Sequence, residues 1–522
     1  MRRLLLFAFL LAAACTTVAP PPSASLILVN GKVFTAGSAR PWAEAVAIRG
    51  ERIVAVGTSA EVRALAGPQT RVVDLNGRVV VPGINDAHVH EPFYIDGERV
   101  DLPPNASAEQ ILAGVADTAK RVPPGKWIRA TYAFALTDDP HLTREALDAA
   151  APAHPVILLN EGGHAFLFNT AALRAAGIGD RDPDPPGGRY GRRADGVLNG
   201  WAYETAIWVK RRAWLEAKPD DELLAHMRRF ADEAVRYGIT SVQSMPALGA
   251  DRMERLTSRL DLPLRWRWME FRMGTVEEHP RMPVKYILDG TPIERGAAMR
   301  EPYADRPNER GYMDYTDAQI RRMVEIAARG EHPLLLHISG DLPAEKLFAE
   351  MNRVDTDWPA RRVRIEHGDW IAPFLADVKR FGVIVVQNPS HMMIPDIVLA
   401  RYGRPHREFQ ALRSLIDAGI PVALGSDGPI NPWLNVMFAT MHRLNPTEAI
   451  TREQAVIAYT RGSAYAELEE KEKGTIEPGK LADLAVLSQD VFTVPAPELP
   501  KTESVMTIVG GRVVWEASAR QR

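Results

Sequence analysis

The stretch VVVPGINDAHVH, residues 79–90, begins the series of apolar runs that decides the fold. A β-branched segment leads there into a segment in which apolar and polar side chains alternate with the period of a strand. Seven more apolar runs follow along the chain, at residues 239–242, 264–271, 284–288, 334–338, 363–367, 383–387 and 422–426. Helical stretches such as 222–237, 317–329 and 408–418 alternate with these runs, which favours a parallel sheet. Eight strand–helix units predict an α/β fold, a (β/α)8 TIM-type barrel over residues 79–470.

Residues near both ends of the chain predict a small β-domain outside the barrel. The dipeptides Asn30-Gly31, Asn76-Gly77 and Gly510-Gly511 each lie between β-favouring runs and tolerate positive φ, so each predicts a tight β-hairpin. Another strand is expected at residues 481–487. We therefore expect residues 26–78 and 471–522 to form one β-domain together.

The segment after the first barrel strand, about residues 91–237, is too long for a single crossover. It predicts an inserted subdomain with candidate strands at 127–134 and 156–160. Its loop 180–196 is rich in Pro, Gly, Arg and Asp and is expected to form part of a lid. Arg189, Arg192 and Arg193 in that loop either attract a substrate carboxylate or are ordinary solvated charges.

The first 25 residues are expected to be an export signal and a linker. Arg2 and Arg3 precede an apolar stretch, residues 4–14, that is too short to span a bilayer. Cys15, the only cysteine of the chain, follows Leu-Ala-Ala-Ala, which resembles a bacterial lipobox, so lipidation at Cys15 is predicted. A plain secretory signal is the alternative. Either interpretation predicts an exported protein of the cell envelope. A lipidated Cys15 makes it lipid-anchored, with Cys15 as the only expected membrane contact, and a plain secretory signal makes it periplasmic.

Composition excludes several classes of protein. The 522 residues include 63 basic and 66 acidic side chains, a net charge of −3, so the chain lacks the basic surface that nucleic-acid binding needs. With 46% hydrophobic and 25% charged residues it has an ordinary soluble composition. Neither a P-loop nor a G-x-S-x-G or H-E-x-x-H motif occurs in the sequence. We expect a small-molecule substrate, and the oligomeric state stays open.

Polar residues that bind metals stand where several of the apolar runs end. His88 and His90 close the first run, His337 the fifth, His367 the sixth and Asp427 the eighth. A single histidine at a strand end is more often a hydrogen-bonded structural residue. Four imidazoles and a carboxylate around one barrel mouth, however, would be costly to bury without a divalent cation. Zinc suits this histidine-rich set best, although iron, manganese, nickel and cobalt accept similar ligands.

These motifs carry a family resemblance. The segments VPGINDAHVH (81–90), RIEH (364–367), GSD (425–427) and GTIEPGKLAD (474–483) resemble the metal-dependent amidohydrolase superfamily, and within it the YtcJ-like, amidohydrolase 3 group. The resemblance implies a distorted barrel with a composite β-sandwich built from both ends of the chain. It also implies that Lys285 is carboxylated and bridges two metal ions, with a single metal ion as the alternative. The alternative for Lys285 is a surface lysine or a salt bridge to Asp289.

The resemblance implies a division of roles among the ligands. His88 and His90 would hold one metal with Lys285 and Asp427, and His337 and His367 would hold the second. Asp427 would take the proton of a metal-bound hydroxide and return it to the leaving nitrogen. His164 and His391 would bind substrate.

The predicted function is metal-dependent hydrolysis of an amide-type C–N bond in an N-acyl or N-formyl amine or a cyclic amide. An esterase or lactonase of the same superfamily is one alternative, and a non-catalytic, metal-binding envelope lipoprotein is another. Deaminases of the superfamily carry a glutamate three residues after the fifth-strand histidine, where this chain has Gly340. That difference argues against deamination.

Overall fold

The computed structural model describes residues 23–90, 96–160, 162–403 and 407–518. Its centre is a barrel of parallel strands that are neighbours in the order in which they occur along the chain. The strands are β8 (Ile84–Val89), β15 (Ile239–Ser244), β16 (Arg265–Trp268), β17 (Glu270–Phe271), β18 (Val284–Ile287), β19 (Leu334–Ile338), β20 (Arg364–His367), β21 (Ile384–Gln387) and β22 (Val422–Leu424). The α/β barrel prediction is therefore confirmed.

The barrel is distorted at two places. The third apolar run is broken at Met269, so that β16 ends one sheet and β17 begins the next. Between β22 and β8 the closure depends on single bonds: the Asp427 amide donates to the His88 carbonyl oxygen (3.0 Å), and the Ser426 amide donates to Asp86 Oδ1 (2.9 Å). The second break lies next to the histidines of the first strand, so it shapes the mouth of the barrel.

Helices cover the outside of the barrel strands. They are α6 (Asp220–Arg236), α7 (Ala250–Thr257), α8 (Asp317–Arg329), α9 (Asp341–Met351), α10 (Trp358–Arg361), α11 (Leu375–Arg380), α12 (Pro395–Tyr402), α13 (Leu412–Asp417), α14 (Pro432–Met441), α15 (Arg452–Ile457) and α16 (Ser463–Ala466). Helix α8 has the predicted bounds, fixed at its start by a capping box between Thr316 and Gln319. Helix α13 begins later than the prediction of 408–418, because Gln410 has a φ of 51° that a helix does not accept.

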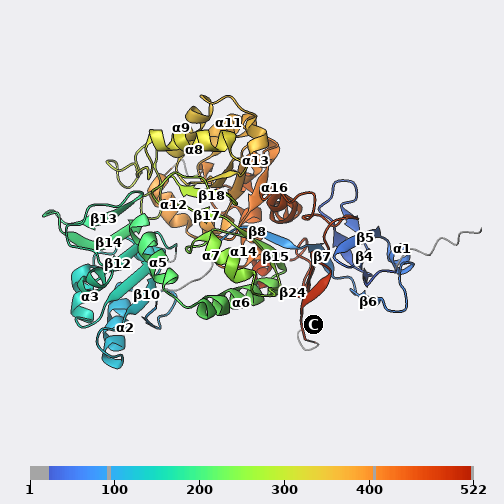
Figure 1. The fold of residues 1–522 in the computed structure, drawn as a ribbon, viewed down its shortest axis with the longest axis horizontal. Helices are drawn as coiled ribbons and strands as arrows, with labels where there is room; N and C mark the ends of the chain where they lie inside the picture. Colours follow the sequence, from blue (N-terminus) through green and yellow to red (C-terminus); the bar gives the residue numbers. More distant parts are fainter. Residues whose placement is uncertain (1–22, 91–95, 161, 404–406, 519–522) are drawn as a thin grey trace, which may run out of the picture.

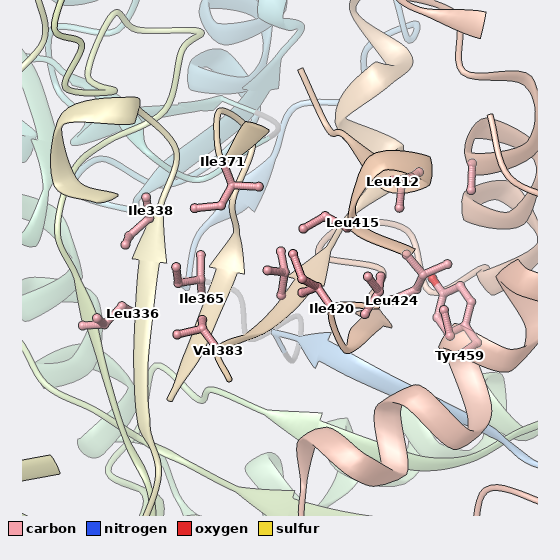
Figure 2. Close-up of a cluster of buried hydrophobic side chains, with 14 of the residues drawn as sticks. Leu336, Ile338, Ile365, Ile371, Val383, Leu412, Leu415, Ile420, Leu424 and Tyr459 are labelled. Carbon is pink, nitrogen blue, oxygen red and sulfur yellow. The ribbon is translucent and has the colours of Figure 1, made fainter. Parts of the chain in front are cut away.

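Successive side chains of a barrel strand point alternately toward the covering helices and toward the inside of the barrel. Leu336 and Ile338 of β19 belong to the same buried cluster as Ile365 of β20 and Leu412 of α13 (Figure 2). Leu335 belongs instead to a separate buried cluster with Met245 and Met269. His337 has the same parity as Leu335, so the strand pattern turns this histidine away from the helices.

Two sheets built from the chain termini lie beside the barrel, with the N-terminal strands β4, β5 and β6 at the right of Figure 1. One has the order β5-β4-β1-β6 and the other the order β25-β24-β23-β7-β2-β3. Their strands are β1 (Leu26–Val29), β2 (Lys32–Phe34), β3 (Trp42–Ala43), β4 (Ala45–Arg49), β5 (Arg52–Gly57), β6 (Arg71–Asp74), β7 (Val79–Pro82), β23 (Leu484–Leu487), β24 (Ser504–Val509) and β25 (Arg512–Glu516). A short helix, α1 (Ser59–Arg63), follows β5.

Two of the three predicted hairpins are wrong. Asn30-Gly31 joins β1 to β2, and Asn76-Gly77 joins β6 to β7, yet each pair of strands lies in two different sheets. The two connections run side by side, since β1 pairs with β6 and β2 with β7, both in parallel. Of the three predicted hairpins, the one at Gly510-Gly511 is present, between β24 and β25. The run at 79–82 is also not a barrel strand, because β7 pairs with β2 and β23.

The insertion forms a six-stranded sheet with the order β13-β14-β12-β11-β10-β9, at the lower left of Figure 1. Its strands are β9 (Glu98–Arg99), β10 (Ile128–Tyr132), β11 (Val156–Asn160), β12 (Ala165–Phe168), β13 (Gly188–Arg192) and β14 (Leu198–Glu204), and its helices are α2 (Ala108–Arg121), α3 (Arg144–Ala150), α4 (Thr170–Ala175) and α5 (Thr205–Glu216). Both candidate strands of the insertion are present as β10 and β11. The predicted lid loop at 180–196 instead contains β13, which pairs antiparallel with β14.

The arginines of the 180–196 segment differ in their surroundings. Arg192 pairs with Asp184 and Arg193 with Glu145, at 2.9 and 2.8 Å, on the surface. Arg189 lies with its guanidinium carbon 4.4 Å from the Tyr203 ring centre and 4.5 Å from that of Tyr312. The interpretation as solvated charges therefore holds for Arg192 and Arg193 but not for Arg189.

The predicted export signal and Cys15 lie outside the described residues. Within the part of the chain that the structure describes, none of the helices combines the length and apolar character needed to cross a bilayer.

Candidate metal centre

Two histidines of the first barrel strand expose bare nitrogens to each other. His90 Nδ1 lies 2.8 Å from the Met245 carbonyl oxygen, which can only accept, so this nitrogen carries the proton. His88 Nδ1 lies 2.6 Å from Glu366 Oε2 and donates to that carboxylate. In the neutral rings both Nε2 atoms therefore carry lone pairs, and they lie 3.3 Å apart. Two lone pairs at this distance repel each other unless a cation or a donor lies near them, and Lys285 Nζ is 3.1 Å from His88 Nε2.

Asp427 completes this group of ligand atoms. Its Oδ1 lies 3.5 Å from both His88 Nε2 and His90 Nε2. Ligands roughly 2.0–2.1 Å from one tetrahedral zinc ion are about 3.4 Å apart, so the three atoms fit one divalent cation. His88, His367 and Asp427 also each offer a ligand atom, all within 4.8 Å of one another.

His367 and His337 form the second half of the cluster. Their ring centres are 4.3 Å apart, and His367 lies 4.8 Å from the His88 ring. His367 Nδ1 contacts Asn388 Oδ1 at 2.9 Å, while His337 Nε2 is buried without a hydrogen-bond partner among the described residues. An unpaired buried imidazole nitrogen is costly, and a metal ion would satisfy it.

The electrostatics favour neutral imidazoles in this cluster. Burial lowers the pKa of His88, His337 and His367, and the nearby Lys285 lowers the pKa of His88 and His337 further. Although burial opposes it, the surrounding histidines hold the pKa of Asp427 well below its usual range. Neutral imidazoles beside an ionised carboxylate are the protonation states that bind a metal.

Lys285 lies at the centre of the cluster. It is 1% exposed, and its Nζ lies 3.1 Å from His88 Nε2. The alternative of a salt bridge to Asp289 does not hold, because Asp289 accepts backbone N–H groups from Ala298, Ser339 and Gly340 instead. Burial lowers the pKa of the Lys285 amine to about 8, so roughly a tenth of it is neutral at pH 7 and about half at pH 8. A neutral amine is the form that can react with carbon dioxide.

The two predicted substrate-binding histidines lie at the edge of this cluster. His391 Nε2 is 3.3 Å from Asp427 Oδ2, and its Nδ1 is 3.4 Å from Asp369 Oδ1. Although burial opposes it, these two carboxylates raise the pKa of His391 to about 10. His164 lies farther out, with its ring centre 5.8 Å from that of His337. The structure thus gathers all eight predicted site residues around one mouth.

Comparison with known proteins agrees with this geometry. The sequence profile described as "Amidohydrolase family" matches residues 71–515 of the chain. The chain belongs to the amidohydrolase family. An N-substituted formamide deformylase of Arthrobacter pascens is 27% identical to this amidohydrolase, over 94% of the chain and 98% of that protein. The putative amidohydrolase YtcJ of Bacillus subtilis is 28% identical, over 86% and 92%.

Solved structures share the fold of this amidohydrolase. An uncharacterized metal-dependent hydrolase from Pyrococcus horikoshii superposes with a TM-score of 0.68 at 20% identity, covering 90% of this chain and 99% of that one. Family and fold together make the protein a hydrolase of carbon–nitrogen bonds, and together with the histidine–aspartate cluster they support a divalent metal.

Gly340 separates this amidohydrolase from the deaminase pattern on steric grounds. A Cβ atom at this position would lie 1.9 Å from the Ala298 carbonyl oxygen. The Gly340 amide also donates to Asp289. No side chain fits there without a backbone shift, so a glutamate could not replace this glycine in the present fold.

Several residues that support the cluster were not predicted. Glu366 binds His88 and also accepts from Arg364 Nε at 2.5 Å, both of them buried. Arg364 in turn donates to the Ala87 carbonyl oxygen and to Gln243. The signal was available in the sequence, because Arg364 and Glu366 are charged residues at alternate positions of a strand that ends on the candidate ligand His367. The roles of Met245 and Asn388 had no such signal.

Proposed function

We propose that this amidohydrolase cleaves the amide-type C–N bond of a small N-acyl or N-formyl amine or of a cyclic amide, with two zinc ions bridged by carboxylated Lys285. The observation that carries the proposal is the pair of bare imidazole nitrogens of His88 and His90, 3.3 Å apart and facing Asp427. The similarity to an N-substituted formamide deformylase over nearly the whole chain supports a formyl or acyl substrate.

The ligands divide into two sets in this proposal. His88, His90 and Asp427 would hold one cation, His337 and His367 would hold the other, and the Lys285 carbamate would bridge them. When bound, the cations act as Lewis acids that raise the acidity of a water ligand and polarise the substrate carbonyl. Glu366 holds the His88 ring through Nδ1, which fixes Nε2 as its metal-binding atom.

The protein's own proton carrier in the reaction is Asp427. It takes the proton of the attacking water and delivers it to the nitrogen that leaves, so the products are an amine and a carboxylic acid. The 3.3 Å contact from His391 Nε2 to Asp427 Oδ2 orients the carboxylate and leaves Oδ1 toward His88 and His90. Asp369 holds the other side of the His391 ring.

The direct test combines metal content with hydrolysis. Purified protein is loaded with zinc, its metal content is measured by mass spectrometry, and a panel of N-formyl amines, N-acyl amines, cyclic amides, esters and lactones is assayed. Two metal ions per chain, falling toward one in Lys285→Ala, and release of amine from at least one amide support the proposal. Hydrolysis of esters or lactones alone favours that alternative, and absence of both metal and hydrolysis favours a binding protein.

We also propose that the two terminal sheets form one composite β-sandwich. The hydrophobic cluster that includes Leu28 of β1, Val46 of β4, Val80 of β7 and Leu484 of β23 supports the sandwich, since these strands come from both sheets.

We propose further that the chain is exported and anchored through lipidated Cys15. Fractionation of cells that express the full chain or Cys15→Ala tests the anchor. The wild type should be in the membrane fraction and the variant should not.

A further inference from the structure

Glu204, the last residue of β14, holds the His164 imidazole by one ring nitrogen. His164 Nδ1 lies 2.9 and 3.0 Å from the two carboxylate oxygens of Glu204. Nearly equal distances are those of an N–H shared by both oxygens of an ionised carboxylate, since a carboxylic acid would offer its single O–H from one oxygen. The proton therefore lies on Nδ1, and in the neutral ring Nε2 carries a lone pair.

The surroundings hold the pair rigidly. The Glu204 amide donates to the His164 carbonyl oxygen at 3.2 Å, and the His164 amide donates to Asn160 Oδ1 at 3.1 Å. The Trp208 ring packs against the His164 ring at 5.2 Å, and its Nε1 donates to the Gly163 carbonyl oxygen at 3.0 Å. Contacts to both backbone and ring thus hold the imidazole in this orientation.

Glu204 itself occupies an unusual position. Its φ of 54° and ψ of −130° are rare for a residue with a side chain, and such strain is retained mainly at functional sites. Its carboxylate is buried at 1% exposure, and a Cβ atom on Gly290 would lie 2.7 Å from Glu204 Oε1. Burial raises the pKa of this carboxyl, whereas the Arg189 guanidinium acts against the rise. Arg189 thus offsets part of the cost of an ionised Glu204.

The His164 ring lies beside the metal ligands. The His164 ring centre is 5.8 Å from that of His337, and the His164 side chain is 16% exposed. None of the described residues hydrogen-bonds to its Nε2. An acceptor without a protein partner at the rim of the cluster is available to a hydrogen-bond donor on the substrate.

We propose that Glu204 is a positioning residue that makes the enzyme select substrates with an N–H on the scissile amide. With its proton held on Nδ1, His164 accepts the substrate N–H at Nε2. An ester or an N-alkylated amide has no such hydrogen and leaves Nε2 unpaired, which costs transition-state stabilisation. The inference rests on the proposed function, because it assumes hydrolysis at the metal centre, and it narrows the substrate class to secondary amides.

The test compares three formyl compounds that release the same acid: N-butylformamide, N-butyl-N-methylformamide and butyl formate. Formate release gives kcat and KM for each compound with the zinc-loaded enzyme, after subtraction of the uncatalysed rate. In Glu204→Gln the carboxamide NH2 can donate to Nδ1, so the proton moves to Nε2 and the acceptor is lost. We expect the kcat/KM preference for N-butylformamide over the other two compounds to fall roughly tenfold. His164→Ala should lose the same preference, and Glu204→Gln should add nothing in that background.

A matched control and a second measurement make the result decisive. Glu350→Gln removes another buried carboxylate, which binds Arg321 and Arg353 on the outer face of α9, and should leave the preference unchanged. Nitrogen-15 NMR of the metal-free protein, with the His164 signal assigned by its loss in His164→Ala, should show the Nδ1–H tautomer in the wild type and the Nε2–H tautomer in Glu204→Gln.

The outcomes separate the two proposals. A wild type that releases formate from N-butylformamide, combined with unchanged preference and tautomer in Glu204→Gln, overturns the role of Glu204. If the zinc-loaded wild type hydrolyses no member of the wider amide panel, the proposed function fails instead. In that case the NMR measurement still decides whether Glu204 holds the proton on Nδ1.

Discussion

The mouth of the barrel and the sheets at the chain termini differ: local sequence patterns predict the structure well at the mouth and poorly in the sheets. In the barrel, an apolar run that stops on a histidine or an aspartate places that residue in a common cluster, as for His88, His337 and Asp427. In the terminal sheets, Asn30-Gly31 and Asn76-Gly77 mark real turns but give the wrong strand partners.

The difference is one of topology. Parallel strands that close into a barrel must bring all their carboxyl ends to one rim, so a residue's position on its own strand is enough to locate it. A turn with positive φ fixes only the local path of the chain. Whether the chain then pairs with the preceding strand or crosses to another sheet depends on distant strands, here β4 and β7.

The largest expected effect is the loss of the proton carrier at the mouth. Asp427→Asn should lower kcat by roughly a thousandfold, since proton transfer by a positioned side chain contributes about 10²–10⁴-fold. Steady-state kinetics on the best amide of the panel measure it. The zinc content of the same variant is measured alongside, because Asp427 is also a proposed ligand and only a variant that keeps its zinc isolates the loss of the proton carrier. A variant that keeps wild-type kcat would remove Asp427 from the mechanism.

Metal removal should destabilise the barrel rather than the terminal sheets. Without zinc, the Nε2 atoms of His88 and His90 lose the ion that both would bind. Zinc at 1,000 times its dissociation constant stabilises the folded state by about 4 kcal/mol, and chelation removes that contribution. Hydrogen exchange is measured with and without chelator. Chelation should speed exchange in β8 and β19 and should leave the exchange rates of β1 and β4 unchanged. Uniform loss of protection across both regions would contradict this separation.

A smaller effect is expected from loss of Glu366, which orients the His88 ring. Glu366→Gln should weaken zinc binding by roughly 10–100-fold, the usual cost of losing the group that orients a metal-bound histidine. Chelator competition measures the affinity, and Glu350→Gln is the matched control. The Arg364 guanidinium lies beside the Glu366 carboxylate. Despite burial, Arg364 and His88 lower the pKa of this carboxyl to about 2, so it stays ionised and can hold the His88 ring.

The lowered pKa of Glu366 also predicts how the stability of the folded state changes with pH. The pKa of Glu366 is lower in the folded state than its ordinary value of 4.5, so its contribution to stability is complete above about pH 4.5 and is lost as the pH falls toward 2. Denaturant unfolding of the metal-free wild type between pH 6 and pH 3 should show a fall in stability that Glu366→Gln lacks. Parallel curves for the two proteins would contradict the assignment.

The sequence was sufficient for the strand order, the bounds of α8 and the set of ligand strands. It was not sufficient for the contacts that orient the ligands. His367 illustrates the limit, because strand alternation alone would place it with Ile365, on the side of the helices. Its φ of 70° breaks the alternation, so that Glu366 and His367, adjacent in sequence, both reach the cluster. The partners of His90 and His164 lie 155 and 40 residues away, and no local pattern indicates them.

The smallest effects come from two turns within the terminal sheets. Gly77 has a φ of 78°, and an added Cβ atom would meet nothing within 4 Å, so Gly77→Ala should cost only the left-handed strain, roughly 1–2 kcal/mol. Gly511 has a similar φ of 72°, but a Cβ atom there would lie 2.0 Å from the Gly50 carbonyl oxygen of the neighbouring sheet. Gly511→Ala should therefore cost more than Gly77→Ala in denaturant unfolding, although both occupy equivalent turn positions in the sequence. Equal costs would mean that local turn geometry alone sets stability at the chain ends, and the contrast with the barrel mouth would then lose its physical basis.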